Sequence, residues 1–239
     1  MIRIFDSLEA LAVAAAERVR SECAEAIRAR GGFRLALSGG TSPLPLYRAL
    51  AAPSQRDAID WTRVEVLFAD ERAVPPDDVE SNFRGVREAL LDPLGFDPAR
   101  VRRMEADAPD LEAAARSYER WLTTPLDLVI LGVGADGHTA SLFPYHPALL
   151  EAVRRVVAVL DSPKPPPRRL TITPRTLREA RVQMVIATGD DKANAVTAAL
   201  ERRGTAGQVP ARLLRDGDWY LDQAAGRGLR GLEPSDRQQ

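Results

Sequence analysis

The sequence is poor in the residues on which disulfide scaffolds and metal centres depend. Its 239 residues include one cysteine, Cys23, and two histidines. A single cysteine excludes an internal disulfide framework and a cysteine-rich metal site, and the chain offers no cluster of ligand residues for a catalytic metal. We therefore expect a protein that works without a metal.

Long apolar runs are also missing. No stretch approaches the roughly 18 apolar residues of a membrane-spanning helix, and the N-terminus lacks the apolar centre of a signal peptide. The 33 basic and 34 acidic residues leave a net charge of −1, without the basic excess typical of nucleic-acid-binding domains. These absences favour a cytoplasmic protein that binds neither membranes nor nucleic acids.

The residues that are present suit one large α/β domain. Apolar residues make up 45% of the chain, which is enough for a sizeable core. We expect a single domain over residues 1–225, in a monomer or a homodimer. The polar, glycine-rich composition of residues 226–239 predicts a flexible C-terminal tail.

Short apolar runs alternate with segments of helical pattern along the chain. We expect strands over residues 2–5, 33–37, 64–69, 126–131, 156–160, 182–187 and 219–222, the last of them at a sheet edge. Helices are expected from Ser7 to Gly31, from near Pro43, and over residues 83–91, 110–123 and 147–154. Such alternation predicts a Rossmann-like, doubly wound, mostly parallel sheet with helices on both faces.

A glycine loop follows the buried strand expected at residues 126–131. The loop contains three glycines, Gly132, Gly134 and Gly137. Asp136 lies directly before Gly137, and His138 directly after it. In open α/β sheets, ligands bind at the carboxyl ends of the strands, so a titratable pair on this loop is a site hypothesis. The alternative for His138 is a histidine that only caps a turn.

The same glycines fit a G-x-G-x-x-G pattern, which by itself is weak evidence for a dinucleotide site. Asp161 stands roughly where the acid that binds the ribose is expected, about 20 residues further on. Pro144 and Pro147 argue against this interpretation, because they interrupt what would have to be one continuous helix.

Other strand ends carry groups that suit an anion. Small residues from Ser38 to Pro43 join a strand to a helix, which leaves backbone N–H groups free to bind an anion, unless the segment is an ordinary tight turn. Asp70, Glu71 and Arg72 follow the next strand, as a surface cluster or a site. Ser81 and Asn82 are expected to cap the helix after them.

Two further cations follow later strands. A proline run at residues 162–167 presents Arg168 and Arg169, and Lys192 is expected in the first turn of a helix, where a cation is unfavourable unless an anion is bound. Cations, carboxylates, an anion-binding loop and one histidine together suit a small phosphorylated substrate and a carbonyl-level reaction assisted by a general base.

These motifs resemble those of the 6-phosphogluconolactonase family, in the superfamily shared with glucosamine-6-phosphate deaminase. The resemblance rests on S-G-G-T-S-P at Ser38 to Pro43, D-E-R-A-V-P at Asp70 to Pro75, Ser81-Asn82, G-V-G-A-D-G-H-T-A-S-L-F-P at Gly132 to Pro144, P-P-R at Pro166 to Arg168 and G-D-D-K-A at Gly189 to Ala193. They occur in the expected order over nearly the whole chain. The glycine-histidine motif is the most specific.

The resemblance implies hydrolysis of 6-phospho-D-glucono-1,5-lactone to 6-phosphogluconate, the second step of the oxidative pentose phosphate pathway, without a cofactor or metal. It makes His138 the general base that activates water, Asp136 a group that orients the loop or the imidazole, and Asp70 a contact to the sugar or a support for the basic residues. The substrate and its phosphate would be bound by Ser38, Gly39, Gly40, Thr41, Arg72, Asn82, Arg168 and Lys192.

Three other functions remain open at this point. An isomerising deaminase would need a further carboxylate beside the histidine, where its G-H-x-A-F-N-E-P motif has glutamate and this chain has Phe143. A nicotinamide oxidoreductase would show spectral changes on titration with NADP. A non-catalytic sugar-phosphate binding protein would be excluded only by measured activity.

Overall fold

The fold is organised around a six-stranded sheet in which all neighbouring strands are parallel. The computed structural model describes residues 1–201 and 204–229. The strand order is β1-β9-β8-β5-β2-β3. The strands are β1 (Ile2–Phe5), β2 (Phe33–Leu37), β3 (Val64–Phe68), β5 (Leu128–Leu131), β8 (Val182–Ala187) and β9 (Asp218–Asp222).

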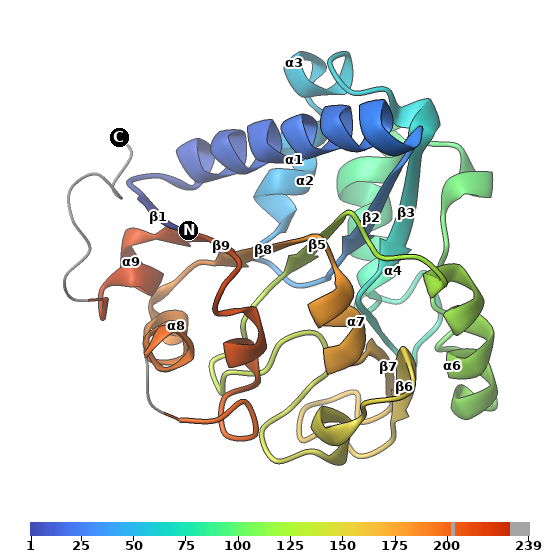
Figure 1. The fold of residues 1–239 in the computed structure, drawn as a ribbon, viewed down its shortest axis with the longest axis vertical. Helices are drawn as coiled ribbons and strands as arrows, with labels where there is room; N and C mark the ends of the chain where they lie inside the picture. The colour runs from blue at the N-terminus through green and yellow to red at the C-terminus, as the bar shows by residue number, and fades with distance from the viewer. Residues whose placement is uncertain (202–203, 230–239) are drawn as a thin grey trace.

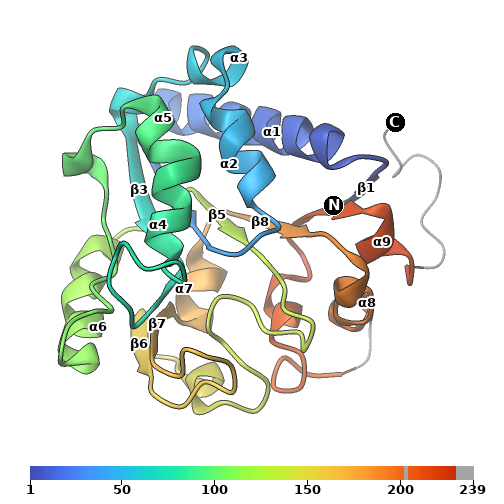
Figure 2. The same ribbon diagram turned by 180° about the vertical axis from the view of Figure 1, so that it is seen from behind.

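Helices cover both faces of this sheet, as the alternation of patterns predicted. Figures 1 and 2 show α1, α2 and α4 on one side and α7 and α8 on the other. The doubly wound α/β fold is therefore confirmed. The α-helices are α1 (Leu8–Arg30), α2 (Leu44–Ala51), α3 (Pro53–Arg56), α4 (Asn82–Val86), α5 (Asp92–Leu94), α6 (Leu111–Glu119), α7 (Pro174–Glu179), α8 (Ala193–Leu200) and α9 (Gln223–Gly226).

Shorter helical turns connect these elements. One is π-helical, η2 (Arg87–Leu91), between α4 and α5. The 3-10 turns are η1 (Trp61–Arg63), η3 (Pro98–Arg100), η4 (Arg120–Leu122), η5 (Pro147–Leu150), η6 (Asp190–Lys192) and η7 (Pro210–Leu214). None of the described helices is long and apolar enough to cross a membrane.

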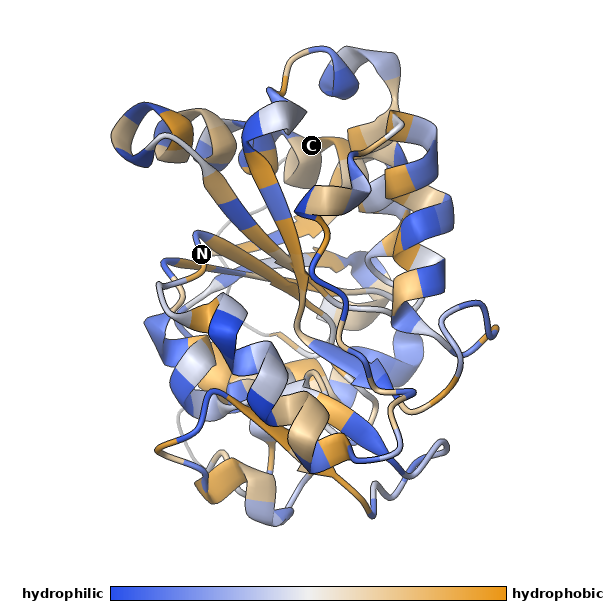
Figure 3. Ribbon diagram, turned by 90° about the vertical axis from the view of Figure 1, so that its right-hand side faces the viewer, coloured by the Kyte–Doolittle hydropathy of each residue, from blue (hydrophilic) through white to orange (hydrophobic). Residues whose placement is uncertain are grey.

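The core lies between the sheet and its two helical layers. Figure 3 shows apolar strands inside and polar helix surfaces outside. All four residues of β5 are buried, as expected for a central parallel strand covered on both faces. The α1 helix starts after Ser7, whose hydroxyl accepts the Ala10 N–H, and ends at Gly31 with a positive φ of 78°.

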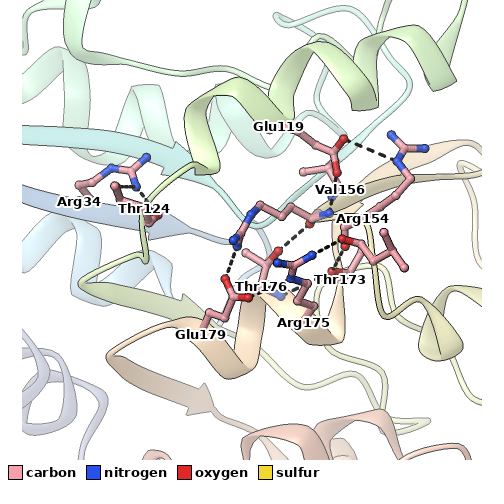
Figure 4. Close-up of polar contacts among 11 residues, drawn as sticks. Arg34, Glu119, Thr124, Arg154, Val156, Thr173, Arg175, Thr176 and Glu179 are labelled. Carbon is pink, nitrogen blue, oxygen red and sulfur yellow. Dashed lines mark hydrogen bonds and ion pairs between the residues drawn. The ribbon is translucent and has the colours of Figure 1, made fainter.

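A second, three-stranded antiparallel sheet was not predicted from the sequence. It consists of β4 (Asp70–Arg72), β7 (Arg169–Ile172) and β6 (Val156–Val159). It continues from the large sheet, since the Ile172 N–H donates to the carbonyl of Ala69, just beyond β3, over 2.8 Å. Two ion pairs anchor it: Arg154, just before β6, pairs with Glu119 of α6, and Arg155 pairs with Glu179 of α7 (Figure 4).

Two sequence predictions about secondary structure were wrong. The strand at the C-terminal end, β9, is not an edge strand, because β1 pairs with its outer side and β3 forms the opposite edge. The helix expected over residues 147–154 ends at Leu150. There the carboxylate of Glu151 accepts the N–H groups of Val153 and Arg154, which draws the backbone out of the helix.

The predicted domain boundaries remain predictions. Gly226, the first residue of the expected tail, is the last residue of α9, and residues 230–239 lie outside the described part of the chain.

The strand order creates a crevice between β2 and β5. The chain passes from β2 to β3 on one side and then returns to β5 on the other, and β2 and β5 pair with Leu35 opposite Leu128. Loops leave such a switch point in opposite directions, which opens a binding crevice at the carboxyl ends of the two strands. The loops that begin at Ser38 and Gly132 both start there.

Candidate functional site

A cavity of about 180 Å³ opens at this switch point. Its walls come from the loops after β2, β5 and β8, from β4 and β7, and from the proline run before β7. The sequence-predicted residues that line it are Ser38, Gly39, Gly40, Thr41, Asp70, Arg72, Asn82, His138 and Lys192. Most of the predicted site is therefore brought together by the fold.

A larger cavity, of about 830 Å³, lies at the opposite, amino ends of β2, β3 and β5. Its arginines are engaged with the protein itself: Arg30 and Arg181 pair with Asp127, and Arg34 pairs with Glu65. It contains no histidine and none of the predicted site residues. The smaller cavity is therefore the candidate site.

The glycine loop after β5 holds His138 against its own backbone. The Gly134 N–H donates to the carbonyl of His138 over 2.8 Å, and Gly137 turns the chain at a positive φ of 82°. A Cβ atom at Gly134 would lie 2.1 Å from the His138 ring. The imidazole of His138 thus occupies the space that the side chain of any residue other than glycine at position 134 would need.

Asp136 orients the imidazole. Its Oδ1 lies 2.5 Å from Nδ1 of His138, which leaves Nε2 as the nitrogen available for proton exchange. Partial burial raises the pKa of Asp136, but the hydrogen bond and charge of His138, with a smaller effect of Lys164, outweigh it and hold the pKa well below its usual range. The carboxylate of Asp136 is therefore ionised at neutral pH.

Phe143 packs its ring against the imidazole of His138. Its ring is fully buried, and its centroid is 4.7 Å from that of His138. On the same ring, the guanidinium of Arg169 lies 5.4 Å from the centroid. One aromatic side chain therefore contacts both the histidine and a cation of the cavity.

Asp70 is buried and fixed by side chains from two other segments. Ser141 Oγ donates to its Oδ2 over 2.7 Å, and Asn82 Nδ2 donates to its Oδ1 over 3.1 Å. Asn82 is itself buried and lies against Gly39. Asp70 thus connects the glycine loop, the small sheet and the start of α4.

Glu71 is the buried carboxylate that sets the position of Asn82. Its two oxygens accept the N–H groups of Arg72, Asn82 and Phe83 and the hydroxyl of Ser81. Burial raises the pKa of Glu71, and its backbone N–H donors oppose that rise. The sequence placed a charge cluster here but did not distinguish this structural carboxylate from its neighbour Asp70.

The loop after β2 has the backbone of an anion-binding site. Ser38 uses its hydroxyl to donate to the carbonyl of Ile130, so that this side chain braces the sheet. The N–H groups of Gly39, Gly40 and Thr41 make no hydrogen bond within the part of the chain that the structure describes. They lie before α2 and line the cavity.

The prediction for Arg168 does not fit the geometry. Its guanidinium lies outside the cavity, 3.5 Å from the carbonyl of Pro109. The neighbouring Arg169 lines the cavity instead and is only 4% exposed. Successive residues of a strand point to opposite faces, so Arg169 shares the inner face of β7 with Thr171, which accepts the N–H of Ser141.

Sequence reasoning also missed Lys164. Its ammonium lines the cavity and lies 3.3 Å from Asp136 Oδ1. The available signal was its position inside the proline run, a stiff segment whose sequence does not show which cation faces the cavity. Of the predicted cations, Arg72 donates to the carbonyl of Glu80, and Lys192 pairs with Asp191.

A doubly wound fold with a histidine–aspartate pair and several cations in one crevice is typical of an enzyme that acts on a small phosphorylated compound. The profile of the family described as Glucosamine-6-phosphate isomerases/6-phosphogluconolactonase matches residues 6–221. The chain therefore belongs to this family.

The relatives with curated names include one from a bacterium and one from a mammal. The 6-phosphogluconolactonase of Streptomyces coelicolor is 42% identical, and the match covers 95% of this chain and 94% of that protein. The 6-phosphogluconolactonase of Rattus norvegicus is 39% identical, over 96% of this chain and 93% of that one.

Solved structures agree with these matches. The 6-phosphogluconolactonase of Trypanosoma brucei superimposes with a TM-score of 0.84 at 26% identity, over 95% of this chain and 98% of that one. A monomeric glucosamine-6-phosphate deaminase gives a TM-score of 0.80 at 22% identity, over 96% of this chain and all of that one, and shares the fold.

Proposed function

We propose that the chain hydrolyses 6-phospho-D-glucono-1,5-lactone to 6-phospho-D-gluconate, the second step of the oxidative pentose phosphate pathway, with His138 as the general base. The family and the named relatives support the reaction. The single observation that carries the mechanism is the 2.5 Å contact between Asp136 Oδ1 and His138 Nδ1 beside the cavity, which leaves Nε2 for the substrate side.

The chemistry needs one group that takes up a proton and returns it. In the proposed reaction, Nε2 of His138 removes a proton from water as the water oxygen bonds to C1 of the lactone. The resulting tetrahedral intermediate then breaks the bond between C1 and the ring oxygen, and the imidazolium gives its proton to that oxygen. A histidine can do both near neutral pH, without a cofactor or a covalent intermediate.

Two carboxylates have different roles beside the base: Asp136 acts on the imidazole, and Asp70 acts on the sugar and on the basic side chains. Asp136 holds the imidazole in one tautomer and stabilises the imidazolium that forms. Asp70 is held by Ser141 and Asn82, so we assign it the role of positioning the sugar and the basic side chains around it.

The phosphate is assigned to the other end of the cavity. The free N–H groups of Gly39, Gly40 and Thr41 suit phosphate oxygens, and Lys192 and Arg72 supply positive charge. Arg169 is a weaker candidate, because three of its N–H groups already bind carbonyls of the proline run.

The isomerising deaminase reaction is not favoured. It moves protons between adjacent carbons and therefore needs an acid–base group beyond the histidine. The corresponding residue, Phe143, is buried under the imidazole and cannot transfer a proton. A cytoplasmic location and a monomeric or homodimeric state remain predictions from the sequence.

The proposed reaction is tested by following proton release from freshly prepared 6-phosphogluconolactone in a pH-stat, with the spontaneous rate subtracted. We expect hydrolysis in proportion to enzyme concentration, and no ammonia from glucosamine 6-phosphate. Hydrolysis no faster than the spontaneous rate would leave a binding protein as the function. Ammonia release at a comparable rate would show deaminase chemistry instead.

The phosphate assignment is tested with Lys192→Gln and, as its matched control, Arg168→Gln. Charge-assisted hydrogen bonds contribute about 1.5–3 kcal/mol, so Lys192→Gln should lower kcat/KM for the phosphorylated lactone by roughly one to two orders of magnitude. Arg168→Gln should change it little. The unphosphorylated gluconolactone should be a poor substrate, and equal kcat/KM for both lactones would refute a phosphate site.

A further inference from the structure

Lys164 contacts the oxygen that orients the histidine. Its Nζ is 3.3 Å from Asp136 Oδ1, and the same oxygen lies 2.5 Å from His138 Nδ1. The ammonium and the imidazole nitrogen can therefore be no more than about 6 Å apart, within the range of a direct charge effect. The carboxylate of Asp136 is shared between two cationic partners.

The backbone of Lys164 is held firmly. Its N–H donates to Ser162 Oγ over 3.2 Å, and its carbonyl accepts the Ser162 hydroxyl over 2.9 Å. The segment is rich in proline, which limits the freedom of the chain. Although the side chain is 41% exposed, its starting point is fixed, so it loses less entropy on pairing than a lysine on a mobile loop.

Arg169 fastens this segment to the small sheet. Its Nε donates to the carbonyl of Pro166 over 3.0 Å, and NH2 donates to the carbonyls of Pro165 and Lys164 over 2.9 and 3.3 Å. NH1 lies 3.5 Å from Ser141 Oγ. Most of the guanidinium donors are therefore used to shape the segment that carries Lys164.

We propose that Lys164 is a positioning residue that acts on His138 through Asp136, and that Arg169 holds it in place. The inference rests on the proposed role of His138 as general base. Lys164 and the imidazole share one carboxylate oxygen, so the positive charge of the ammonium acts by Coulomb repulsion on the charge that His138 gains when it takes a proton from water.

Other charged groups line the same cavity as the histidine. Lys192 comes from η6, Arg72 and Asp70 from β4, and Arg169 from β7. Asp70 is held by Ser141 and Asn82, and Lys192 pairs with Asp191. Among the lysines and arginines that line the cavity, Lys164 is the one that forms an ion pair with Asp136, the carboxylate that orients the imidazole.

The direct test is the titration of the imidazole in the free protein. The chain has two histidines, so NMR of the ring Cε1–H groups in a His146→Asn background reports His138 alone. We expect Lys164→Gln to move the midpoint of this titration upward by roughly 0.5–1 pH unit, because a nearby positive charge is removed. Lys164→Arg should restore the parent midpoint. An unmoved midpoint in Lys164→Gln would overturn the proposal.

Kinetics then separate positioning from phosphate binding. In the pH dependence of kcat, Lys164→Gln should move the acid limb to higher pH, as in the NMR titration, and should leave KM within about three-fold of the parental value. Lys192→Gln should raise KM without moving the acid limb. A ten-fold rise in KM for Lys164→Gln with an unmoved limb would make Lys164 a phosphate ligand and contradict the proposal. Because the NMR titration needs no substrate, it stands even if lactone hydrolysis is not observed.

The adjacent residues Arg168 and Arg169 provide a matched pair of variants to test whether Arg169 holds Lys164 in place. Arg169→Lys keeps the charge but cannot reach three carbonyls, so it should reproduce the shift of Lys164→Gln. Arg168→Lys, on the outer face of the same segment, should leave the midpoint unchanged. Equal midpoints for the two variants would show that Arg169 does not hold Lys164.

Discussion

Asn82 occupies the space that a side chain at Gly39 would need. A Cβ atom at Gly39 would lie only 1.9 Å from Asn82 Oδ1. The buried amide of Asn82 in turn donates to Asp70. The absence of a side chain at one strand end therefore allows a carboxylate from another strand to be held in place.

We expect Gly39→Ala to lower kcat/KM by roughly 10- to 100-fold, because small displacements of positioning groups are costly in catalysis. The added methyl group would push Asn82 away and loosen Asp70. Lactone hydrolysis by the folded variant checks this expectation. Gly32→Ala is the control, since its Cβ would meet only the Arg63 carbonyl at 3.4 Å. A Gly39→Ala enzyme with parental kcat/KM would contradict the proposed packing role.

Glu71 should contribute to stability rather than to chemistry. Each of its oxygens accepts two hydrogen bonds, so Glu71→Gln would place an NH2 group against two donors. We expect a loss of about 1–3 kcal/mol in the free energy of unfolding, measured by urea denaturation. Glu80→Gln, at an exposed position on the same loop, is the control. Equal stability of the two variants would show that Glu71 does not anchor α4.

The pH dependence of stability should reveal Asp136. The pKa of Asp136 is lowered in the folded protein from 3.8, the usual value of an aspartate. A carboxylate with a lowered pKa stabilises the fold above the unfolded-state value, and this contribution is lost as the pH falls toward the folded-state value. Asp136→Asn should therefore be less stable than the parent at pH 6, and the difference should shrink toward pH 3. A difference that grows on acidification would contradict the assigned ion pairs.

The strands of the large sheet could be predicted closely from the sequence. Residues 33–37 and 182–187 form strands with the predicted limits, because short apolar runs bounded by glycine or charged residues have few alternatives. The position of β9 could not be predicted in this way. Which strands lie at an edge depends on pairing between the two ends of the chain, where β1 lies beside β9, and local patterns do not report it.

The site was predictable where its residues lie in the loop that follows a strand. His138 and Lys192 line one cavity because their strands end at the same edge of the sheet. The choice between Arg168 and Arg169 depended on β7, a strand that was not predicted. Once β7 is known, the alternation of its side chains places Arg169 and Thr171 on one face. The signal available in the sequence was Thr171, a polar residue between the apolar residues Leu170 and Ile172.

The roles of Lys164 and Asn82 lie further from the sequence. Each depends on a contact between segments that are distant along the chain: Lys164 with Asp136, and Asn82 with Gly39. No periodicity or composition encodes such a pair.

The role of His138 is tested most directly by His138→Asn, compared with His146→Asn. Positioned general bases contribute about 10²–10⁴-fold, so His138→Asn should lose hydrolysis of 6-phosphogluconolactone by that factor while remaining folded. His146 caps η5 and pairs with Asp161, away from the cavity, and asparagine can replace it as a cap. His146→Asn should therefore keep the parental rate. A folded His138→Asn protein that hydrolyses the lactone as fast as the parent would contradict general-base catalysis by His138.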